Sequence, residues 1–202
     1  MDNQHLFSYD NQIRATYPTI CGVDEAGRGP LAGPVCCASV ILKDTYYSPL
    51  LNDSKKVSKK NREILYREII ENAVSYNVQF ISPDIIDDIN ILHASLLGMQ
   101  KAIDELAIKP SMALIDGNVC PSVLVFSQPV IKGDSTSACI AAASILAKVA
   151  RDHYMLKLHE QFPEYQLDKH KGYPTKLHYE MIEKHGVQSF HRKSFLKKRG
   201  IT

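Results

Sequence analysis

Short apolar runs alternate with longer segments of helical period along this chain, and that alternation constrains the fold more than any other feature. Residues 20–23 and 35–42 are apolar runs of strand length, joined by a loop rich in glycine and proline. Residues 74–80 alternate strictly between apolar and polar side chains, which is typical of a half-buried strand. Two more strands are predicted at 112–115 and at 123–131, the second interrupted by a proline.

The segments between these runs have the composition and the punctuation of helices. Ser58 is placed to cap the first helix, and Ser82 followed by proline opens the second, which ends before Pro110. The longest helix, rich in alanine, is predicted over 135–162, and a shorter one over 175–185. This order of elements predicts an α/β fold: a mixed β-sheet flanked by helices, with a helical segment at the C-terminal end.

Length and composition exclude several classes of protein. The 202 residues suffice for one domain, and no apolar run approaches the ~20 residues that a membrane span needs. The first residues include an acid and no apolar run, so no signal peptide is expected. Five cysteines without a Cys-x-x-Cys pair suit neither a disulfide framework nor a zinc ribbon. We therefore expect a cytoplasmic protein with no membrane contact.

Basic residues gather in two places, although the net charge is only +2. No acid occurs from residue 184 to the end, where the basic residues are Lys184, Arg192, Lys193, Lys197, Lys198 and Arg199. The second cluster is Lys55, Lys56, Lys59 and Lys60. Such clusters are either solvated surface or sites that attract a phosphate backbone, and composition alone leaves both options open.

Four acids stand at the ends of predicted elements rather than on helix surfaces. Asp24 and Glu25 follow the first strand, Asp116 follows the strand at 112–115, and Asp134 precedes the longest helix. If the two strands are neighbours, Asp24 and Asp116 meet at one edge of the sheet. Hard divalent cations such as Mg²⁺ bind carboxylate oxygens, and two such ions together can support phosphodiester cleavage.

Each of these acids also has an ordinary structural explanation. Asp134 is placed to cap the following helix, Asp116 with the next glycine has the composition of a turn, and Asp24 with Glu25 can begin a solvated loop. Taken together the ordinary explanations are strained, because neighbouring carboxylates at a shared edge repel one another without a cation.

Other chemistries fit the sequence poorly. The glycine-rich segment 27–33 resembles a dinucleotide-binding loop, but such a loop must open a helix, and the run 35–42 predicts a strand. A helical zinc-protease motif fails at Pro163, where a histidine is required. Ser144 lies in an apolar helix and is expected to pack in the core rather than act as a nucleophile.

Residues 22–30, Gly-Val-Asp-Glu-Ala-Gly-Arg-Gly-Pro, resemble the signature segment of the type 2 ribonucleases H, specifically bacterial ribonuclease HII. Further motifs of that family follow in the same order, so that the resemblance spans about residues 20 to 196. They are Asn-Asp-Ser-Lys-Lys at 52–56, Ile-Asp-Gly at 115–117, Lys-Gly-Asp at 132–134 with the helix segment 141–152, His-Lys-Gly-Tyr-Pro-Thr at 170–175 and His-Arg-Lys-Ser-Phe at 191–195.

The resemblance implies an RNase H-like mixed β-sheet flanked by helices. Residues 19–165 would form the catalytic core, and residues 166–202 a helical, basic C-terminal segment of the same domain. Residues 1–18 match no motif, so we expect an N-terminal extension, for which flexibility is an option.

The resemblance also implies an activity. The family cleaves the RNA strand of RNA–DNA hybrids and incises duplex DNA 5′ of embedded ribonucleotides, leaving 5′-phosphates, which serves ribonucleotide removal and primer clearance. The implied mechanism uses two divalent ions, Mg²⁺ or Mn²⁺. By position, the catalytic and metal-binding residues are Asp24, Glu25, Asp116 and Asp134.

Substrate contacts are implied at two further places. In the family, a Gly-Arg-Gly segment lies against the backbone at the RNA–DNA junction and a tyrosine packs on the next sugar; by position these are Gly27, Arg28, Gly29 and Tyr173. Glycine suits that role because only a backbone without side chains approaches a 2′-hydroxyl closely. Candidate phosphate contacts are Lys55, Lys56, Lys132, Lys148 and Lys171.

Two alternatives remain open, namely a DNA-directed nuclease of the RNase H fold and an RNA–DNA hybrid-binding protein without turnover. The first has no use for a reader of the 2′-hydroxyl, and the second has no use for four clustered acids. We expect a monomer, and a replication clamp as partner can be neither assigned nor excluded from the sequence.

Overall fold

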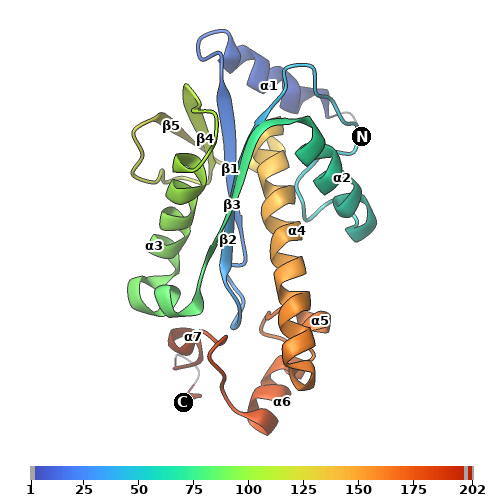
Figure 1. The fold of residues 1–202 in the computed structure, drawn as a ribbon, viewed down its shortest axis with the longest axis vertical. Helices are drawn as coiled ribbons and strands as arrows, with labels where there is room; N and C mark the ends of the chain where they lie inside the picture. Colours follow the sequence, from blue (N-terminus) through green and yellow to red (C-terminus); the bar gives the residue numbers. More distant parts are fainter. Residues whose placement is uncertain (1–2, 198–199, 202) are drawn as a thin grey trace.

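The computed structural model describes residues 3–197 and 200–201. Its centre is a five-stranded sheet in the order β3-β2-β1-β4-β5 (Figure 1). The strands are β1 (Ile20–Ala26), β2 (Val35–Leu42), β3 (Ala73–Ile81), β4 (Met112–Asp116) and β5 (Phe126–Val130). The pairs β1–β2 and β2–β3 are antiparallel, whereas β1–β4 and β4–β5 are parallel. The predicted mixed sheet is confirmed.

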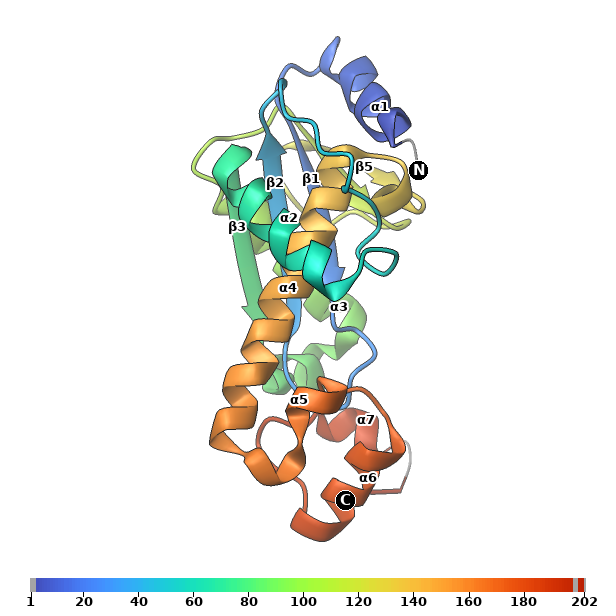
Figure 2. The same ribbon diagram turned by 90° about the vertical axis from the view of Figure 1, so that its right-hand side faces the viewer.

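Helices cover both faces of this sheet. They are α1 (Gln4–Arg14), α2 (Lys59–Asn72), α3 (Pro83–Asp104), α4 (Ala138–Gln161), α5 (Leu167–His170), α6 (Lys176–His185) and α7 (Lys193–Lys197). One core cluster joins the sheet to α1, α2 and α4, and a second joins its other face to α3. The helices α5, α6 and α7 gather at one end of the molecule, beyond the strands (Figure 2).

Burial on both faces explains why β2 is an uninterrupted apolar run. Cys36, Ala38 and Val40 belong to the core beneath α4, while Cys37 and Ile41 belong to the core beneath α3. A strand whose two faces are both covered needs no polar alternation. All five cysteines are free.

The helix α4 lies unusually close to β1. A Cβ atom on Gly22 would come within 2.0 Å of the backbone carbon of Cys139, in the first turn of α4. The missing side chain therefore lets the beginning of α4 rest on the backbone of β1, which brings that end of the helix to the strand that carries Asp24.

The start of α4 differs from the prediction. Residues 133–135 form a separate 3₁₀ turn, and the helix begins at Ala138, where the Ser137 hydroxyl accepts the N–H of Ile140 at 3.2 Å. The expectation that Asp134 caps this helix is therefore wrong, because Ser137 occupies the cap position. The Asp134 carboxylate is left for other contacts.

Two further elements differ from the sequence patterns. The strand β5 includes Pro129 instead of being broken by it, because β5 is a sheet edge where the missing N–H is not needed. The helix α3 contains a kink at Asn90, whose φ is 65°. The Asn90 side chain accepts the N–H groups of Leu92 and His93 and so caps the second half of the helix.

Most of the predicted N-terminal extension is an ordered helix. Leu6 of α1 is buried in the core, and Asp10 accepts the N–H of Cys139 at 2.8 Å, in the first turn of α4. In residues 4–14, Leu6, Tyr9 and Ile13 recur at helical spacing and pack on the core, so this helix has an amphipathic pattern that supports its attachment beside the Asp10 bond.

The C-terminal segment is helical, as predicted, and packs on the end of α4. Met155 and Leu158 of α4 share a small core with Tyr165, Leu167 and Phe190. Lys198 and Arg199 of the basic tail lie outside the described residues. Within the described part of the chain, no helix has the length and apolar character needed to cross a membrane.

Candidate active site

The ends of two parallel strands bring the first acids together. The register pairs Val23 of β1 with Ile115 of β4, so Asp24 and Asp116, the next residues, emerge at the same edge of the sheet. Asp24 is buried, and its Oδ1 accepts the N–H of Glu25 at 2.6 Å. This is the arrangement that the positions of Asp24 and Asp116 in the sequence predict for neighbouring strands.

The turn before α4 adds the fourth acid. The N–H of Gly133 donates to Oδ1 of Asp116 at 2.7 Å, which fastens this turn to the end of β4. Asp134, the next residue, is buried, and its Oδ2 lies 3.7 Å from the Lys55 ammonium. The Asp116–Gly133 contact thus places Asp134 beside the strand-end acids, without a role for it as a helix cap.

Electrostatic interactions show that the four acids form one group. Burial raises the pKa of Asp24 well above its ordinary value, and the charges of Glu25 and Asp116 raise it further. Burial also raises the pKa of Glu25, which Arg28 opposes and Asp116 reinforces. The pKa of Asp134 is raised by burial and then by Asp53 and Asp116. Asp116 is thus the common neighbour of the other three.

This donor set fits a hard divalent cation. As the side chains stand, the part of the chain that the structure describes holds no group of three or more His, Cys, Asp or Glu residues arranged to hold a metal ion. The carboxylates nevertheless share one edge: the charge of Asp116 raises the pKa of Asp24, Glu25 and Asp134, and the cations Lys55 and Arg28 oppose these shifts in part. Carboxylate oxygens with unbalanced negative charge are what Mg²⁺ and Mn²⁺ prefer.

The structure adds three residues that sequence reasoning missed. Asp53 is buried and shares a hydrogen bond with Asp134, which helps raise the pKa of Asp134. Ser144 is in the core as predicted, but its hydroxyl bonds that of Ser54 at 2.9 Å and also bonds Asp24, lowering the pKa of Asp24. The signal for all three was their place in family motifs, residues 52–56 for Asp53 and Ser54 and residues 141–152 for Ser144.

The segment of Gly27, Arg28 and Gly29 follows the acids directly. Gly27 is buried with φ +94°, whereas Arg28 and Gly29 are exposed. One guanidinium nitrogen of Arg28 lies 3.5 Å from a Glu25 carboxylate oxygen. The N–H of Leu31 donates to the carbonyl of Gly172 at 2.8 Å, so this loop and the segment of Tyr173 are adjacent.

Tyr173 presents its ring beside the loop. Its side chain is partly exposed, and the Lys148 ammonium lies 5.9 Å from the centre of its ring. Lys148 also pairs with Asp152 at 2.7 Å. Lys171 is half-buried, and burial lowers its pKa; the nearby ammonium groups of Lys59 and Lys148 lower it further, against the opposing charge of Asp152.

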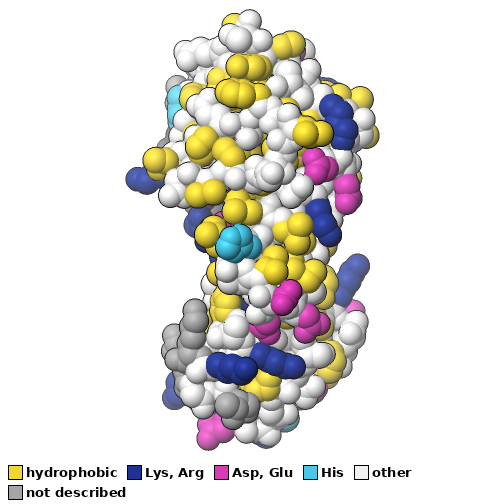
Figure 3. Space-filling model, turned by 90° about the vertical axis from the view of Figure 1, so that its left-hand side faces the viewer, with side chains coloured by type: hydrophobic (Ala, Val, Ile, Leu, Met, Phe, Trp, Pro, Cys, Tyr) yellow, Lys and Arg dark blue, Asp and Glu magenta, His cyan; other side chains and the backbone are white. Residues whose placement is uncertain are grey.

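The candidate lysines therefore fall into two groups. Lys55 and Lys56 lie near Asp134, where Lys56 donates to the Ser135 hydroxyl at 3.1 Å, and Lys132 is exposed just before the same turn. The second group, Lys148 and Lys171, lies near Tyr173. Figure 3 shows further Lys and Arg side chains on the lower part of one face, where Figure 1 places α7.

Two arginines that the sequence places among surface charges are buried in the structure. Arg192, part of the terminal basic cluster, and Arg151, on the predicted face of Lys148, are 0% and 1% exposed. They are therefore not available as surface phosphate contacts.

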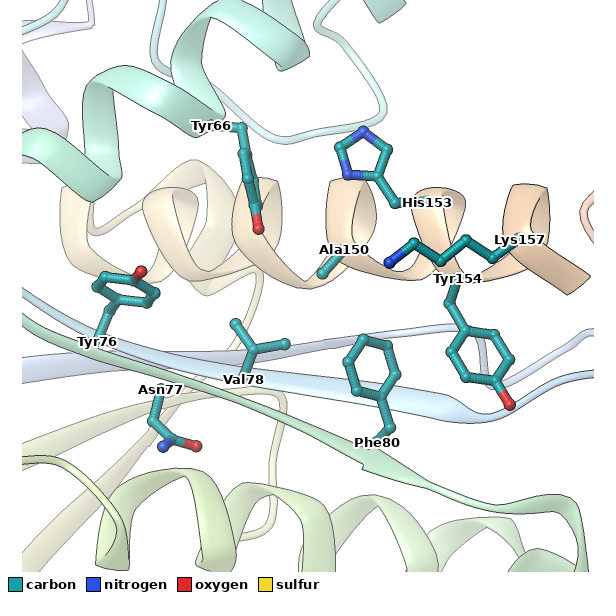
Figure 4. A pocket seen from close by; sticks show the side chains of 9 residues that line it. All are labelled: Tyr66, Tyr76, Asn77, Val78, Phe80, Ala150, His153, Tyr154 and Lys157. Atoms are coloured by element: carbon teal, nitrogen blue, oxygen red, sulfur yellow. The ribbon is translucent and has the colours of Figure 1, made fainter.

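A groove of about 550 Å³ lies away from the acids, between β3 and α4 (Figure 4). Four aromatic rings line it, those of Tyr66, Tyr76, Phe80 and Tyr154, with the Lys157 side chain across it. None of the four acids borders this groove, so it is separate from the candidate active site.

Known proteins resemble this chain closely in sequence. The family model described as Ribonuclease HII matches residues 21–198. The Ribonuclease HII of Endomicrobium trichonymphae is 50% identical over 194 residues, covering 95% of this chain and 92% of the relative. That of Idiomarina loihiensis is 53% identical over 176 residues, covering 87% and 94%.

Solved structures agree with the fold. The ribonuclease H2 of Pyrococcus horikoshii OT3 superimposes with a TM-score of 0.75 at 26% identity, covering 91% of this chain and 96% of that one. RNase HII of Archaeoglobus fulgidus, solved in a complex with PCNA, gives 0.71 at 26% identity, covering 86% and 93%. Bst-RNase HIII in complex with Mn²⁺ gives 0.68 at 17% identity, covering 90% and 68%, and supports the fold alone.

The mixed sheet is thus the RNase H-like sheet that the motifs imply. The family match runs through the strand-end acids, the glycine loop and the C-terminal helices, and the relatives align over most of their own length. The chain belongs to the ribonuclease HII family and is a ribonuclease H enzyme.

Proposed function

We propose that this enzyme hydrolyses the RNA strand of RNA–DNA hybrids and also incises duplex DNA on the 5′ side of embedded ribonucleotides. The observation that carries the proposal is the meeting of Asp24, Glu25, Asp116 and Asp134 next to a glycine loop that adjoins Tyr173. Carboxylates supply the chemistry, and the loop with Tyr173 supplies a reader of the sugar. In the cell, this activity serves ribonucleotide removal and primer clearance.

The four acids are the proposed ligands of two divalent ions, Mg²⁺ or Mn²⁺. When bound, such ions lower the pKa of the attacking water and stabilise the leaving 3′-oxygen. The chain's own part is to hold the carboxylates. The Gly133 N–H fixes Asp116, and the Ser144 hydroxyl bonds Asp24. Lys55 lies beside Asp134 and lowers its pKa.

Recognition of the ribonucleotide is assigned to Gly27, Arg28, Gly29 and Tyr173. Gly29 is exposed and has open space where a Cβ would be, so a substrate backbone has access to it. The bond between Leu31 and Gly172 keeps the loop beside Tyr173. Against a tyrosine ring a deoxyribose packs well, whereas a ribose would bring its 2′-hydroxyl into the contact, which favours a junction between RNA and DNA.

Phosphate contacts are assigned to Lys55, Lys56 and Lys132 near the acids and to Lys148 and Lys171 near Tyr173. Contacts of this kind are independent of sequence and weaken with salt. A sliding clamp is a candidate partner only through the Archaeoglobus relative, which was solved with PCNA. The monomeric state and the cytoplasmic location remain predictions.

A cleavage assay tests the proposal. A labelled DNA duplex with one ribonucleotide is incubated with the protein and Mg²⁺ or Mn²⁺, beside an all-DNA duplex and an Asp24→Asn variant. We expect one cut 5′ of the ribonucleotide, absent from both controls, with binding by the variant retained. Cleavage of the all-DNA duplex would instead identify a DNA-directed nuclease. Binding without any cut under either metal would identify a hybrid-binding protein.

A further inference from the structure

Two buried arginines, Arg151 of α4 and Arg192 just before α7, have only backbone oxygens as polar partners. Within the described chain neither forms an ion pair with a carboxylate. Each guanidinium donates three hydrogen bonds, all to main-chain carbonyls. Neither side chain is used by the proposed chemistry.

Arg192 holds the glycine loop itself. Its Nη2 donates to the carbonyl of Gly27 at 2.6 Å, its Nη1 to that of Arg28 at 2.8 Å, and its Nε to that of Gly33 at 3.0 Å. The guanidinium also lies over the ring of Phe195, 5.3 Å from its centre. A single rigid fork therefore fixes the carbonyls at both ends of the loop.

Arg151 joins the loop to the segment of Tyr173. Its Nε donates to the carbonyl of Pro34 at 2.9 Å, and its Nη2 to that of Ala32 at 3.0 Å. Its Nη1 reaches across to the carbonyl of Lys171 at 3.0 Å, two residues before Tyr173. One side chain thus ties together the two segments that carry the proposed sugar contacts.

The unfavourable burial of these two charges indicates that their role is to orient the carbonyls they bind. Burying a guanidinium without a carboxylate is unfavourable, and an apolar side chain of similar size fills a core at lower cost. What arginine offers instead is a planar set of donors with fixed directions. Lysine has the same charge but only one nitrogen, which cannot reach three separate carbonyls.

The direction of the carbonyls has a consequence for the opposite side of the loop. In a trans peptide, the C=O of one residue and the N–H of the next point in opposite directions. Because the carbonyls of Gly27 and Arg28 point inward to Arg192, the N–H groups of Arg28 and Gly29 point outward. Among the described residues neither N–H finds an acceptor within the protein.

We propose that Arg192 and Arg151 are positioning residues for substrate recognition, which rests on the proposed function of the loop. Arg192 turns two free N–H donors toward the substrate, where a phosphate or sugar oxygen accepts them. Arg151 sets the distance between those donors and Tyr173. Neither arginine contacts the substrate.

The test compares two charge-preserving variants, Arg192→Lys and Arg151→Lys, with a matched control. Tyr165→Phe removes one hydroxyl, whose proton is shared between the carbonyls of His185 and Gly186 in the same C-terminal segment, and leaves every hydrogen bond to the loop in place. For each full-length protein we would measure Tm, hydrogen–deuterium exchange of peptides covering residues 27–34, and kcat/KM on the one-ribonucleotide duplex.

In the Arg192→Lys variant we expect faster amide hydrogen exchange in the loop. We also expect its kcat/KM to fall by on the order of 10- to 100-fold, the usual effect of a misplaced binding group. The Arg151→Lys variant should show the same changes, and it provides the test if Arg192→Lys does not fold. Tyr165→Phe should lose Tm but keep kcat/KM within about twofold. Three results would each overturn the proposal. They are normal cleavage by a folded arginine variant, lost cleavage with unchanged amide exchange in the loop, and an equal fall in kcat/KM in Tyr165→Phe. An inactive wild type would refute the proposed function instead, while loop exchange would still test the arginines.

Discussion

Substitution by alanine at the two glycines of the Gly-Arg-Gly segment should differ in its effect on stability. At Gly27, φ is +94° and a Cβ would lie 2.0 Å from Nε and 2.4 Å from Cδ of Arg151. At Gly29, no atom lies within 4 Å of the same position, and φ is not in the left-handed region. Gly27 is thus required by the fold, whereas Gly29 is free of internal constraint.

The magnitude follows from these contacts. A side chain at the φ of Gly27 costs about 1–2 kcal/mol. Arg151 cannot withdraw from the new Cβ without losing at least one of its three hydrogen bonds, each worth about 1.5–3 kcal/mol for a charged donor. The sum is about 3 kcal/mol or more, and so a Tm lower by about 6–12 °C for a chain of this length. For Gly29→Ala we expect a change within about 0.5 kcal/mol.

Thermal unfolding and cleavage of the one-ribonucleotide duplex measure the two effects separately. Gly29→Ala should keep the wild-type Tm and lose on the order of tenfold or more in kcat/KM, because its methyl group occupies the substrate side of the loop. Gly27→Ala should lose both stability and activity. The division between the two glycines is refuted if Gly27→Ala has the Tm of the wild type, or if the Tm of Gly29→Ala is as low as that of Gly27→Ala. Wild-type cleavage by Gly29→Ala would refute the close approach of the substrate.

Three further predictions concern groups that hold the site. The buried His178 bonds the carbonyl of Tyr173 through Nδ1 at 3.0 Å, and its Nε2 lies 3.2 Å from Nε2 of His191, which is also buried. Burial lowers the pKa of His178 to about 3 and that of His191 to about 4. Because these histidines stay neutral in the fold while the unfolded chain takes up protons, their contribution to stability should be full above about pH 6.5 and fall on acidification, by about 2 kcal/mol per histidine at pH 5. The buried carboxyls with raised pKa change stability in the opposite sense, so the fall is measured as the difference in urea midpoints between the wild type and a His178→Gln variant; the same pH dependence in both proteins would contradict it. Ser144→Ala removes a hydrogen bond that lowers the pKa of Asp24, so the acidic limb of the pH–rate profile should move to higher pH, and an unmoved limb would count against the contact. Asp10→Ala removes the acceptor of the first turn of α4 and should cost about 1 kcal/mol, read as a Tm lower by a few degrees, with partial recovery in Asp10→Asn.

The patterns that the sequence predicted well are those with a strong local cause. The buried runs of β1 and β2 survive in the structure, because both faces of these strands are covered and their apolar composition reports it. The strand β3 forms where the alternation predicts it, but its burial is reversed: Val74, Tyr76 and Phe80 are exposed, whereas Ser75 is buried. The meeting of Asp24 and Asp116 needed one assumption, neighbouring parallel strands, which the register supplies. Both fold and acid positions were therefore within reach of the sequence.

What the sequence could not predict depends on contacts between distant segments. Asp134, Ser135 and Ser137 are all plausible helix caps, and only the turn fastened to Asp116 selects Ser137. The α1 helix lies in a segment that matches no family motif, and its bond to α4 joins Asp10 to Cys139, 129 positions away in the sequence. Arg151 is one of many basic residues by sequence, and its burial depends on a loop more than a hundred positions away.

The two edges of the sheet differ in a way that bears on how molecules of this protein meet one another. The outer strand β3 has nine residues without charge or proline, and its residues 74–81 form no backbone hydrogen bond beyond the β2 ladder. The opposite edge, β5, is short and carries Pro129. Exposed strands template further strands, but a sheet with one open edge can extend only once. Two copies joined through β3 would form a closed, two-fold pair with blunt outer edges, so edge-to-edge growth ends at a dimer rather than a fibre.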